Sequence, residues 1–595
     1  MLSTEQKKFI ELALKGNNVL VDACIGSGKT TSIQELCNVL PTDKKILYLT
    51  YNKLLKLDAK NKIKKKNVLV QNYDGFAWWR LKATGNPTPN QANCVTMFNT
   101  ILPNVDIYDI LIIDEYQDIK EEHAIMLNYI KSLNNNMQII AVGDMEQKIY
   151  DMTTLNVKAF IEEFLDTYIP MEFTQCFRLS EDLAAMLGRI WNKKIVGVNS
   201  NCKVSTLDNK EITDYLATHE IGDILCLGSR QGLMSKTLNQ LEAKYPEKFN
   251  KNTVYASIRE SDCCVAPDKK CAIFTTFDSS KGLERNTCVV FDFTSEYWFV
   301  RLNNPQVKYE ILRNIFCVAA SRGKNEIIFV TDNHSTALTE DILSDTTQLN
   351  YKIGSVGISS MFDFKYVEDV EHCYQMLNIE KVRDIEDTID IPSHDGYIDL
   401  SPCIGIYQEA NFFKNYDIDR QIDTVREANP NRTLYINPKW SLEKKILALT
   451  SFETHQKRYL HQVTTPFITE EQSALINDRL STVFNPEKEI IQRKCEIIFN
   501  EYADFTKGES FAAVGRCDVI HNNDVFELKF VSSLSHEHFL QCACYVVALR
   551  KKYGYLWNVK TNEMYRITIP NRGAFLNMVS TTITKRRFKH FYGNT

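Results

Sequence analysis

Short apolar segments recur along the first 340 residues, and helical patterns lie between them. Apolar runs of about four to eight residues that alternate with helices are typical of parallel strands buried on both faces of a sheet. Several of the runs end in Asp, Thr or Gly, at the sheet edge where such folds bind ligands. The pattern predicts an α/β fold with parallel sheets. The runs are NVLVDA (18–23), KILYLT (45–50), DILIID (109–114), QIIAVGD (138–144), DILCLGS (223–229), TCVVFDF (287–293) and EIIFVTD (326–332).

A glycine-rich segment, ACIGSGKTT, directly follows the first run and precedes a helical pattern, SIQELCNVL. In that context the backbone N–H groups at a helix N-terminus can bind phosphate oxygens. Lys29 would reach the β- and γ-phosphates of a nucleotide, and the Thr30 hydroxyl would ligate Mg²⁺. Ala23 stands where the general P-loop pattern has its first glycine, so a glycine-rich turn without a nucleotide is the alternative. The residues expected at the phosphates are Gly26, Ser27, Gly28, Lys29, Thr30 and Thr31.

The run LIIDEYQD (111–118) carries the acidic pair Asp114 and Glu115 at the end of a strand. Asp114 can hold the Mg²⁺ ion, and Glu115 can activate the water that attacks the terminal phosphate. A strand-end acidic pair can also cap a helix, but here a phosphate loop precedes it in the same α/β pattern. The loop and the acidic pair together predict a protein that hydrolyses ATP with the help of Mg²⁺.

Net charge and cysteine content limit the class of protein. The 595 residues carry a net charge of −5, so any nucleic-acid contact must come from local patches. No apolar run approaches the roughly 18–20 residues that cross a bilayer, and the N-terminal segment is charged and amphipathic, so we expect neither a membrane span nor a signal peptide. The 17 cysteines include no C-x-x-C pair. We therefore expect reduced, mostly buried thiols in a cytoplasmic or nuclear protein, with neither zinc nor an iron–sulfur cluster.

Further motifs follow in order through residue 330, and with the phosphate loop they resemble those of the UvrD/Rep/PcrA-type superfamily 1 helicases. The segments that carry the resemblance are LSTEQ (2–6, Q motif), LTYNK (49–53, Ia), NYDGF (72–76, Ib), IDEYQD (113–118, II), AVGDMEQKIY (141–150, III), QCFRLS (175–180, IV), TTFDSSKGLE (275–284, V) and VAASRGK (318–324, VI). The resemblance implies two RecA-like lobes that close on ATP and step 3′ to 5′ along single-stranded DNA. We expect the first lobe at residues 1–147, with a small insertion at about 76–105. The second lobe is expected at 148–345, with a small insertion at about 231–270.

The resemblance also implies roles for residues outside the phosphate loop. Gln6 would read the adenine, Phe177 would stack on it, and Arg178 and Arg322 would reach the γ-phosphate from the second lobe. Gln147 would sense that phosphate. The remaining residue implied at the nucleotide is Glu284.

For DNA, the residues implied are Tyr51, Asn52, Tyr73, Tyr150, Thr276 and Asp278. The three tyrosines offer flat faces on which single-stranded bases can stack. For each of them, packing in the protein core is the alternative. Asp74 and Asp278 replace histidines common in motifs Ib and V, and YDMTT follows motif III in place of a tryptophan. These departures leave the DNA contacts there open, and the small insertions leave strong duplex unwinding open.

The last 250 residues differ in character from the first lobes. The acidic, turn-rich run DIEDTIDIPSHDGYIDLSP (384–402) lies within residues 346–435, which we interpret as a connector. From 436 to 595 we expect a separate α/β domain. It should open with helices in SLEKKILALTSFETHQKRYL (441–460) and PEKEIIQRKCEIIFNEY (486–502). Strand pairs should follow in VGRCDVIHNNDVFELKF (514–530) and in YGYLWNV with EMYRITI (553–569).

The strand pair at 514–530 carries Asp518, Glu527 and Lys529 in the pattern D-x(8)-E-x-K. Two carboxylates beside a lysine can hold a divalent metal and polarise a water, although a hairpin with solvated charges is the alternative. The pattern resembles the core of the PD-(D/E)XK nucleases. Gln541 and Tyr545, four residues apart on the next helix, resemble the RecB-like branch of that family. The resemblance implies Mg²⁺ or Mn²⁺ on the two carboxylates, with the lysine orienting the attacking water.

The PD-(D/E)XK fold also implies an acid or a histidine on an upstream helix. Glu489 and Glu496 are the first candidates, and His455 and His461 are weaker ones. The sequence does not decide between them.

The leading hypothesis is therefore an ATP-dependent DNA translocase or helicase coupled to a metal-dependent DNA nuclease, acting in replication, repair or recombination. One alternative is a translocase whose closing domain only binds DNA or a protein. Another is an RNA-directed motor driven by NTP. The expected partners are DNA with single-stranded regions and proteins of replication or repair, with no membrane.

Overall fold

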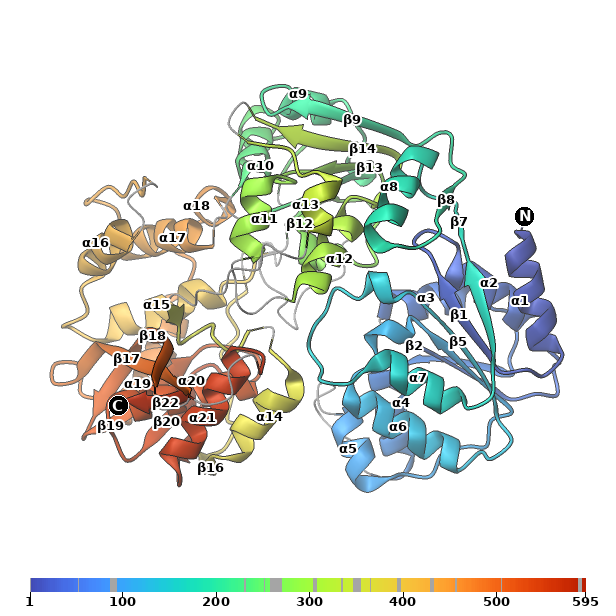
Figure 1. Cartoon of the computed structure of the whole chain (residues 1–595). Helices are drawn as coiled ribbons and strands as arrows, with labels where there is room; N and C mark the ends of the chain where they lie inside the picture. The colour runs from blue at the N-terminus through green and yellow to red at the C-terminus, as the bar shows by residue number, and fades with distance from the viewer. Residues whose placement is uncertain are drawn as a thin grey trace. The chain divides into compact units, whose positions relative to one another are not determined.

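The computed structural model divides the chain into two compact units (Figure 1). The first unit contains Met1–Met234, Ala272–Leu302 and Val307–Leu349, and the second contains Ser235–Cys271, Asn303–Gln306 and Asn350–Thr595. For a few further positions within helices and strands only the backbone is described. The structure describes residues 2–594 except 52, 86–93, 230–231, 251, 257–269, 303–307, 333–334, 346–354, 364, 393–397, 429–432, 455–456, 504–505 and 587–590.

The first lobe of the first unit is a parallel sheet of order β3-β2-β4-β5-β1-β6. All five side chains of β2 and of β4 are buried, because helices cover both faces of the sheet. Helices α1, α2 and α3 pack on one face, and α4 to α7 pack on the other. The strands are β1 (Val19–Ala23), β2 (Ile46–Thr50), β3 (Val68–Asn72), β4 (Ile110–Asp114), β5 (Gln138–Gly143) and β6 (Ile169–Phe173). The helices are α1 (Thr4–Leu14), α2 (Lys29–Val39), α3 (Lys53–Lys62), α4 (Tyr73–Ala83), α5 (Cys94–Ile101), α6 (Glu121–Ser132) and α7 (Val157–Leu165).

The second lobe is also a parallel sheet, in which five strands of the first unit run in the order β12-β10-β13-β14-β9. The strands are β9 (Lys203–Asp208), β10 (Ile224–Gly228), β12 (Ala272–Thr276), β13 (Arg285–Val290) and β14 (Gly323–Thr331). The helices are α8 (Glu181–Trp191), α9 (Ile212–Ala217), α11 (Ser295–Leu302), α12 (Tyr309–Ala319) and α13 (Glu340–Ser344). Two such lobes confirm the expected pair of RecA-like sheets. The segments predicted as strands from their apolar runs all form strands.

The lobes are joined by a segment in which β7 (Gln175–Cys176) leads through α8 to β8 (Val196–Gly197). Gln175 pairs with Val196 and Cys176 with Gly197, so the two ends of the segment are held side by side. A Cβ on Gly197 would lie 2.2 Å from the carbonyl oxygen of Ser180, which explains why glycine is required there. We call residues 175–197 the α8 segment.

The second unit is built on a mixed sheet of order β16-β21-β20-β19-β18-β17-β22, with β15 pairing to β18. Helices α14, α20 and α21 pack on one face, and α15, α17 and α19 pack on the other. The strands of this sheet are β15 (Val356–Gly357), β16 (Asn378–Arg383), β17 (Ile490–Ala503), β18 (Thr506–His521), β19 (Asp524–Lys529), β20 (Gly554–Asn558), β21 (Glu563–Thr568) and β22 (Phe591–Asn594). The short strand β11 (Val254–Ala256) also falls in the second unit but is not part of this sheet. The helices are α14 (Val367–Gln375), α15 (Ser401–Phe412), α16 (Ile418–Ala428), α17 (Leu442–Glu453), α18 (Arg458–Gln462), α19 (Glu470–Ser481), α20 (His536–Ala548) and α21 (Arg572–Ile583), while α10 (Leu233–Lys244) lies at the boundary of the two units.

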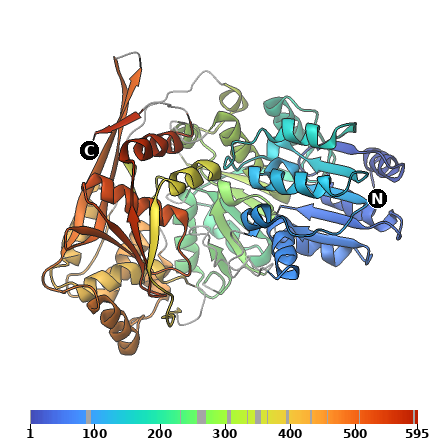
Figure 2. The ribbon, with the colours of Figure 1, turned by 90° about the horizontal axis from the view of Figure 1, so that it is seen from below.

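The helix predicted over residues 486–502 is wrong, because most of this stretch is the long strand β17. Cys495, Ile497 and Phe499 are buried, whereas Glu496 and Ile498 between them are exposed. This alternation of period two is that of a strand with one face on the core. Figure 2 shows the long β17–β18 hairpin in orange with the C-terminal β22 in red beside it.

Residues interpreted from the sequence as a connector contribute elements to the second unit. Strand β16 pairs antiparallel with β21 at the edge of the sheet. Helix α15 buries Cys403, Ile404 and Tyr407 in the core on one face of the sheet. The described residues of the acidic run (384–392 and 398–402) thus belong to the second unit.

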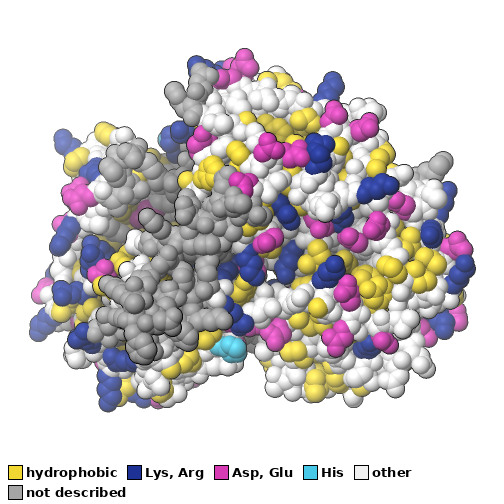
Figure 3. Space-filling view, viewed as in Figure 1, with side chains coloured by type: hydrophobic (Ala, Val, Ile, Leu, Met, Phe, Trp, Pro, Cys, Tyr) yellow, Lys and Arg dark blue, Asp and Glu magenta, His cyan; other side chains and the backbone are white. Residues whose placement is uncertain are grey.

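Charged side chains of both signs are interspersed on the surface seen in Figure 3. Within the described residues, no helix has both the length and the apolar character needed for a membrane crossing. The cysteines that the structure describes are free thiols, and all of them except Cys271 are buried.

Candidate active sites

The phosphate loop begins where β1 ends and leads directly into α2. Gly26 and Gly28 have φ values of +67° and +76°, in the region that favours glycine. A Cβ on Gly26 would also lie 2.8 Å from the Cβ of Arg178. Glycine is therefore needed both for the turn and for the close approach of the α8 segment. Lys29 is the first residue of α2 and is 7% exposed.

Asp114 ends β4 beneath this loop and is fully buried. Its Oδ2 accepts a hydrogen bond of 2.8 Å from the Tyr48 hydroxyl and one of 3.5 Å from Thr30 Oγ1. Its Oδ1 is buried and has no hydrogen-bond partner. Burial and the neighbouring Glu115 raise the pKa of Asp114 to about 7. Asp114 is thus a buried carboxylate whose ionisation is disfavoured, and one of its oxygens has no hydrogen-bond partner. With the Thr30 hydroxyl beside it, this carboxylate fits the ligand set of Mg²⁺.

Glu115 follows with a φ of +58°, which turns its side chain back toward the loop. Lys29 Nζ lies 3.7 Å from Glu115 Oε2, and the Gln117 amide donates to the same oxygen. Burial alone would raise the pKa of Glu115, but the ammonium groups of Lys29 and Lys281 outweigh it and hold that pKa below its ordinary value. Glu115 is thus kept ionised, as a general base requires.

Two residues predicted at the adenine lie against the phosphate loop. Gln6 Nε2 donates to the Ser27 carbonyl at 3.0 Å, and its Oε1 accepts from the Ser3 amide at 2.8 Å in a capping box of α1. The Phe177 amide donates to the Gly26 carbonyl at 2.9 Å, and the Phe177 side chain is 42% exposed. A Cβ on Gly28 would lie 2.9 Å from Gln6 Nε2 and 3.9 Å from Phe177 Cδ2. The side-chain amide of Gln6 and the exposed ring of Phe177 therefore converge at one side of the loop.

The two arginines predicted at the γ-phosphate differ in their partners. Arg178 Nη2 donates to Glu284 Oε2 at 2.6 Å, and Glu284 also pairs with Lys324 at 2.7 Å. Arg322 is 3% exposed, and its Nε and Nη2 have no hydrogen-bond partner. Burial and the nearby Arg178 lower the pKa of Arg322 to about 9. A buried guanidinium with unpaired donors, within electrostatic reach of Glu115 and Arg178, fits an anionic phosphate.

Gln147 lies in the short 3₁₀ turn after β5 (Met145–Gln147) and is 6% exposed. Its Nε2 donates to Asp144 Oδ2 at 2.6 Å. Lys281, from the loop after β12, donates to the Gln147 carbonyl at 2.9 Å and to both oxygens of Asp118 at 2.6 Å. The second lobe thus contacts motifs II and III of the first lobe through Lys281, which the sequence analysis did not single out.

Among the residues predicted at DNA, Tyr51 and Tyr150 form a stacked pair with ring centroids 6.4 Å apart and planes at 28°. Lys281 Nζ lies 5.8 Å from the Tyr150 ring centroid. A shallow pocket is lined by both tyrosines together with Gln117, Asp118, Ile119, Lys120, Lys148, Met152 and Thr153. Aromatic faces beside lysines are the combination that holds single-stranded nucleic acid without reading its sequence.

The other predicted DNA contacts lie in different surroundings. Tyr73 is 2% exposed and stacks on His123 at 4.2 Å, so it packs in the core of the first lobe. Asp278 forms a two-bond ion pair with Arg301, at 2.9 and 3.0 Å. Thr276 Oγ1 donates to Ser279 Oγ at 3.4 Å. Asn52 lies outside the described residues.

The second unit brings Asp518, Glu527, Lys529, Gln541 and Tyr545 together from β18, β19 and α20. Lys529 Nζ donates to Glu527 Oε1 at 2.8 Å and to Gln541 Oε1 at 2.9 Å. Gln541 Nε2 donates to Glu527 Oε1 at 2.8 Å and lies 3.4 Å from the Tyr545 hydroxyl. The backbone N–H of the residue after Glu527 donates to Asp518 Oδ2 at 2.7 Å. The described side chains predicted for the nuclease core thus form one hydrogen-bonded cluster.

Gly515 allows the helix to approach the strand at this cluster. A Cβ there would lie 2.9 Å from both Cε1 and the hydroxyl of Tyr545. Any larger residue would displace the Tyr545 ring, whose hydroxyl lies 3.4 Å from Gln541 Nε2. The glycine before the Asp therefore has a packing reason.

Glu409 on α15 is a third acid of this cluster, and the sequence analysis missed it. Burial and the charge of Glu527 raise the pKa of Glu409 to about 8, and its Oε2 accepts from Gln492 Nε2 at 2.6 Å. Burial, Glu527 and Glu409 together raise the pKa of Asp518 well above its ordinary value. Glu409 lies in the stretch interpreted as a connector, and no spacing rule ties it to Asp518.

The upstream residues proposed from the sequence have other partners. Glu489 is buried and accepts a hydrogen bond of 2.9 Å from the backbone N–H of Asn485. His521 Nδ1 also lies 2.9 Å from its carboxylate. Glu496 and His461 are exposed, and His455 lies outside the described residues. Glu409 on α15 is the helical acid that interacts electrostatically with Asp518 and Glu527.

The donor set of this cluster fits a divalent cation. Three carboxyl groups lie within electrostatic reach of one another, and Glu527 Oε2 is buried without a hydrogen-bond partner. Like charges at this density ionise together only when a cation compensates them. Oxygen donors of this kind are typical of Mg²⁺ and Mn²⁺ sites.

The first unit thus combines two RecA-like sheets with a phosphate loop, an acidic pair and a buried arginine, an arrangement that fits nucleotide binding and hydrolysis. A family model described as an AAA domain matches residues 6–153, which contain the loop, the acidic pair and Gln147. No curated protein sequence matches the chain.

Solved helicase structures are similar to part of the chain. Arterivirus nonstructural protein 10 (helicase) is 11% identical and has a TM-score of 0.29, with 55% of this chain and 62% of that chain covered. S. cerevisiae Dbp5 bound to RNA and ADP BeF3 is 13% identical, with a TM-score of 0.35 and coverage of 58% and 86%. The DUF1998 helicase MrfA bound to DNA is 12% identical, with a TM-score of 0.32 and coverage of 56% and 49%. The match thus spans less than two thirds of the arterivirus helicase.

Proposed function

We propose that this chain is an ATP-driven motor that moves along single-stranded DNA and carries a metal-dependent DNA nuclease in its second unit. The observation that carries the motor is Arg322, a buried guanidinium with two unpaired nitrogen atoms that interacts electrostatically with Glu115 and Arg178. Bound Mg²⁺ would supply charge neutralisation at the β- and γ-phosphates. The other interactions with the nucleotide and the attacking water would come from the protein's own residues.

At that site Glu115 would accept the proton of the attacking water, because Lys29 and Lys281 keep it ionised. Lys29 and Arg322 would stabilise the negative charge that develops on the γ-phosphate. Arg178 would join them by exchanging its bond to Glu284 for one to phosphate, since both partners are anionic.

The nucleic-acid contact is proposed at Tyr51 and Tyr150. Their stacked rings and the lysines of the same pocket can hold bases and phosphates of a single strand. Lys281 contacts both Tyr150 and the Gln147 carbonyl, so the strand and the phosphate sensor share one side chain. Movement in the 3′ to 5′ direction, on DNA in repair, replication or recombination, is part of the proposal because of the UvrD-type motif order.

The nuclease is proposed at Asp518, Glu527 and Glu409. The three acids would bind one or two Mg²⁺ or Mn²⁺ ions, which supply an activated water and neutralise the phosphodiester. Lys529, held by Glu527 and Gln541, would orient that water or stabilise the developing charge. Tyr545 would fix the position of Gln541.

One assay with purified protein tests both activities. End-labelled single- and double-stranded DNA is incubated with and without ATP and Mg²⁺, and ATP hydrolysis is followed in parallel with DNA or RNA of equal length. We expect DNA-stimulated hydrolysis and Mg²⁺-dependent cleavage. Lys29→Ala should abolish hydrolysis, and Asp518→Ala should abolish cleavage while leaving hydrolysis intact.

Other outcomes point to the alternatives. Hydrolysis without any metal-dependent cleavage would make the second unit a non-catalytic DNA- or protein-binding module. Stronger stimulation by RNA than by DNA would make the protein an RNA-directed motor. Hydrolysis by Lys29→Ala at the rate of the unmutated protein would contradict the motor itself.

A further inference from the structure

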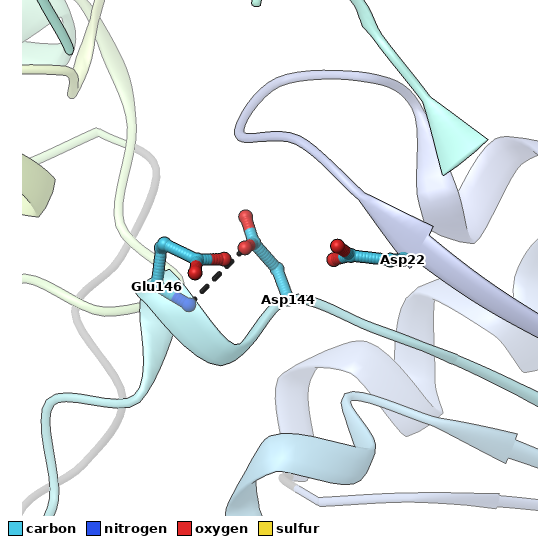
Figure 4. Close-up of side chains that lie close together, drawn as sticks. All are labelled: Asp22, Asp144 and Glu146. Carbon is cyan, nitrogen blue, oxygen red and sulfur yellow. Dashed lines mark hydrogen bonds between the residues drawn. The ribbon is translucent and has the colours of Figure 1, made fainter. Parts of the chain in front are cut away.

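Lys193 joins three carboxylates at the edge of the first-lobe sheet. Its Nζ lies 2.6 Å from Asp22 Oδ1, 2.9 Å from Asp144 Oδ1 and 2.9 Å from Glu146 Oε2. Figure 4 shows the carboxylates close together, with Asp22 at the end of β1 and the other two after β5. The Lys193 side chain is 13% exposed. Its positive charge offsets the mutual repulsion of the three carboxylates.

One of these carboxylates is connected to the hydrolytic residues. Asp144 is 1% exposed, and its Oδ2 accepts from the Gln147 amide at 2.6 Å. The Asp144 backbone N–H donates to Gln117 Oε1 at 3.0 Å, and the Gln117 amide donates to Glu115. Lys193 is therefore one carboxylate away from the predicted phosphate sensor and two hydrogen-bonded groups away from the predicted base.

Lys193 belongs to the α8 segment, whose other end carries Phe177 and Arg178 at the phosphate loop. The pairing of β7 with β8 holds the two ends together. Asn192 ends α8 with a φ of +50°, and the Lys193 amide donates to the Gly188 carbonyl at 2.8 Å. This turn directs the lysine back toward the first lobe. The segment thus contacts the nucleotide site with its first residues and motif III with Lys193.

A second side chain of α8 contacts the same motif through the second lobe. Trp191 Nε1 donates to Asn314 Oδ1 at 3.0 Å. Asn314 Nδ2 in turn donates to the Lys148 carbonyl at 3.1 Å. Of Trp191, Lys193 and Asn314, Lys193 is the residue whose charged group contacts the Asp144 side chain.

We infer that Lys193 is a positioning residue. It holds Asp144, and through Asp144 the Gln147 side chain, in a fixed position relative to the α8 segment, which carries Arg178. This coupling allows nucleic-acid binding to stimulate ATP hydrolysis. This inference rests on the proposed motor function. Without Lys193, Asp144 and Glu146 would repel each other. The Gln147 amide would then lose the fixed acceptor that sets its orientation.

The test is steady-state ATP hydrolysis with and without saturating single-stranded DNA, at varied MgATP, for Lys193→Ala and Lys193→Arg. Lys194→Ala is the matched control, since Lys194 is adjacent, exposed and equally charged. We expect Lys193→Ala to lower the DNA-stimulated kcat at least tenfold and to bring the ratio of stimulated to unstimulated rate close to one. The KM for ATP should change less than threefold, and Lys193→Arg should recover part of the stimulation.

A second control separates positioning from general loss of charge. Asp22→Asn removes one ion pair of Lys193 but leaves the pair to Asp144, so we expect stimulation within twofold of the unmutated protein. If Lys193→Ala does not melt cooperatively, Lys193→Gln replaces it in the same measurement, with the same expected loss.

The inference is overturned if Lys193→Ala keeps the stimulation ratio of Lys194→Ala, or if it raises the KM for ATP tenfold with an unchanged kcat. It is also overturned if Asp22→Asn loses as much stimulation as Lys193→Ala. An unmutated protein that hydrolyses no ATP with any nucleic acid would instead overturn the proposed function, and that result is seen before any Lys193 variant is measured.

Discussion

Lys529 Nζ lies 2.8 Å from Glu527 Oε1 within the sheet of the second unit. The Glu527 side chain is 2% exposed, and its other oxygen has no hydrogen-bond partner. Burial would lower the pKa of Lys529, but Glu527 and Asp518 raise it above its ordinary value, so the lysine stays charged. One cation therefore serves a cluster that also contains Glu409. The raised pKa values of Asp518 and Glu409 favour protonated acids, and a bound divalent metal would allow the carboxyl groups to ionise together.

Glu409→Gln should lower metal-dependent DNA cleavage by about tenfold or more, because it removes one acid from the cluster that would hold the metal. Cleavage of labelled single-stranded DNA at varied Mg²⁺ measures the loss, and ATP hydrolysis should not change. Glu489→Gln is the matched control, since Glu489 is equally buried but contacts His521 and Asn485 instead. If Glu489→Gln abolishes cleavage and Glu409→Gln does not, the assignment of Glu409 is wrong.

Tyr48→Phe should lower kcat for ATP hydrolysis by about tenfold to a hundredfold. It deletes the 2.8 Å hydrogen bond to Asp114, and a bond to a buried carboxylate contributes about 1.5–3 kcal/mol. Steady-state hydrolysis at varied Mg²⁺ is the measurement. Tyr108→Phe is a control in the same lobe, because the Tyr108 hydroxyl is buried without a hydrogen-bond partner. Equal activity of the two variants would mean that Tyr48 does not support the metal ligand.

Tyr150→Ala should weaken binding of single-stranded DNA by about 1–3 kcal/mol, the typical contribution of one stacked base. Fluorescence anisotropy with a labelled oligonucleotide measures the affinity. Tyr150→Phe keeps the ring and should bind normally. Tyr73→Phe should also bind normally, because Tyr73 packs against His123 in the core. Weaker binding by Tyr73→Phe than by Tyr150→Ala would place the strand elsewhere.

His123 should make the stability of the first unit depend on pH. Burial, with a smaller effect of Lys120, lowers the pKa of His123 from 6.5 to about 3. As pH falls below 6.5 the unfolded chain takes up a proton at this position and the folded chain does not, so the free energy of unfolding falls by about 1.4 kcal/mol per pH unit until about pH 3. Melting temperatures between pH 7 and 4 should fall less steeply for His123→Gln. A slope in His123→Gln as steep as that of the unmutated protein would show that His123 is not the cause.

The segments that depend on local chemistry are predictable from the sequence alone. The seven apolar runs form strands because a short buried run flanked by helical patterns has few other ways to satisfy its backbone. The phosphate loop belongs to a single strand–turn–helix unit, and Asp114 and Glu115 follow one another at the end of one strand, so each pattern is local in the sequence. Asp518, Glu527 and Lys529 meet because neighbouring strands of one hairpin bring them together.

Tertiary structure decided what depends on distant parts of the chain. The stretch after Pro486 forms β17 rather than a helix because one face of the strand packs on α20. Glu409 joins Asp518 from a region with no motif, and Lys193 reaches Asp144 from the far end of α8. Tyr73 is buried whereas Tyr150 lies beside a pocket, although both match motifs. Sequence spacing determines which groups share a turn or a hairpin, but burial and charge compensation between segments far apart in the chain depend on how those segments pack.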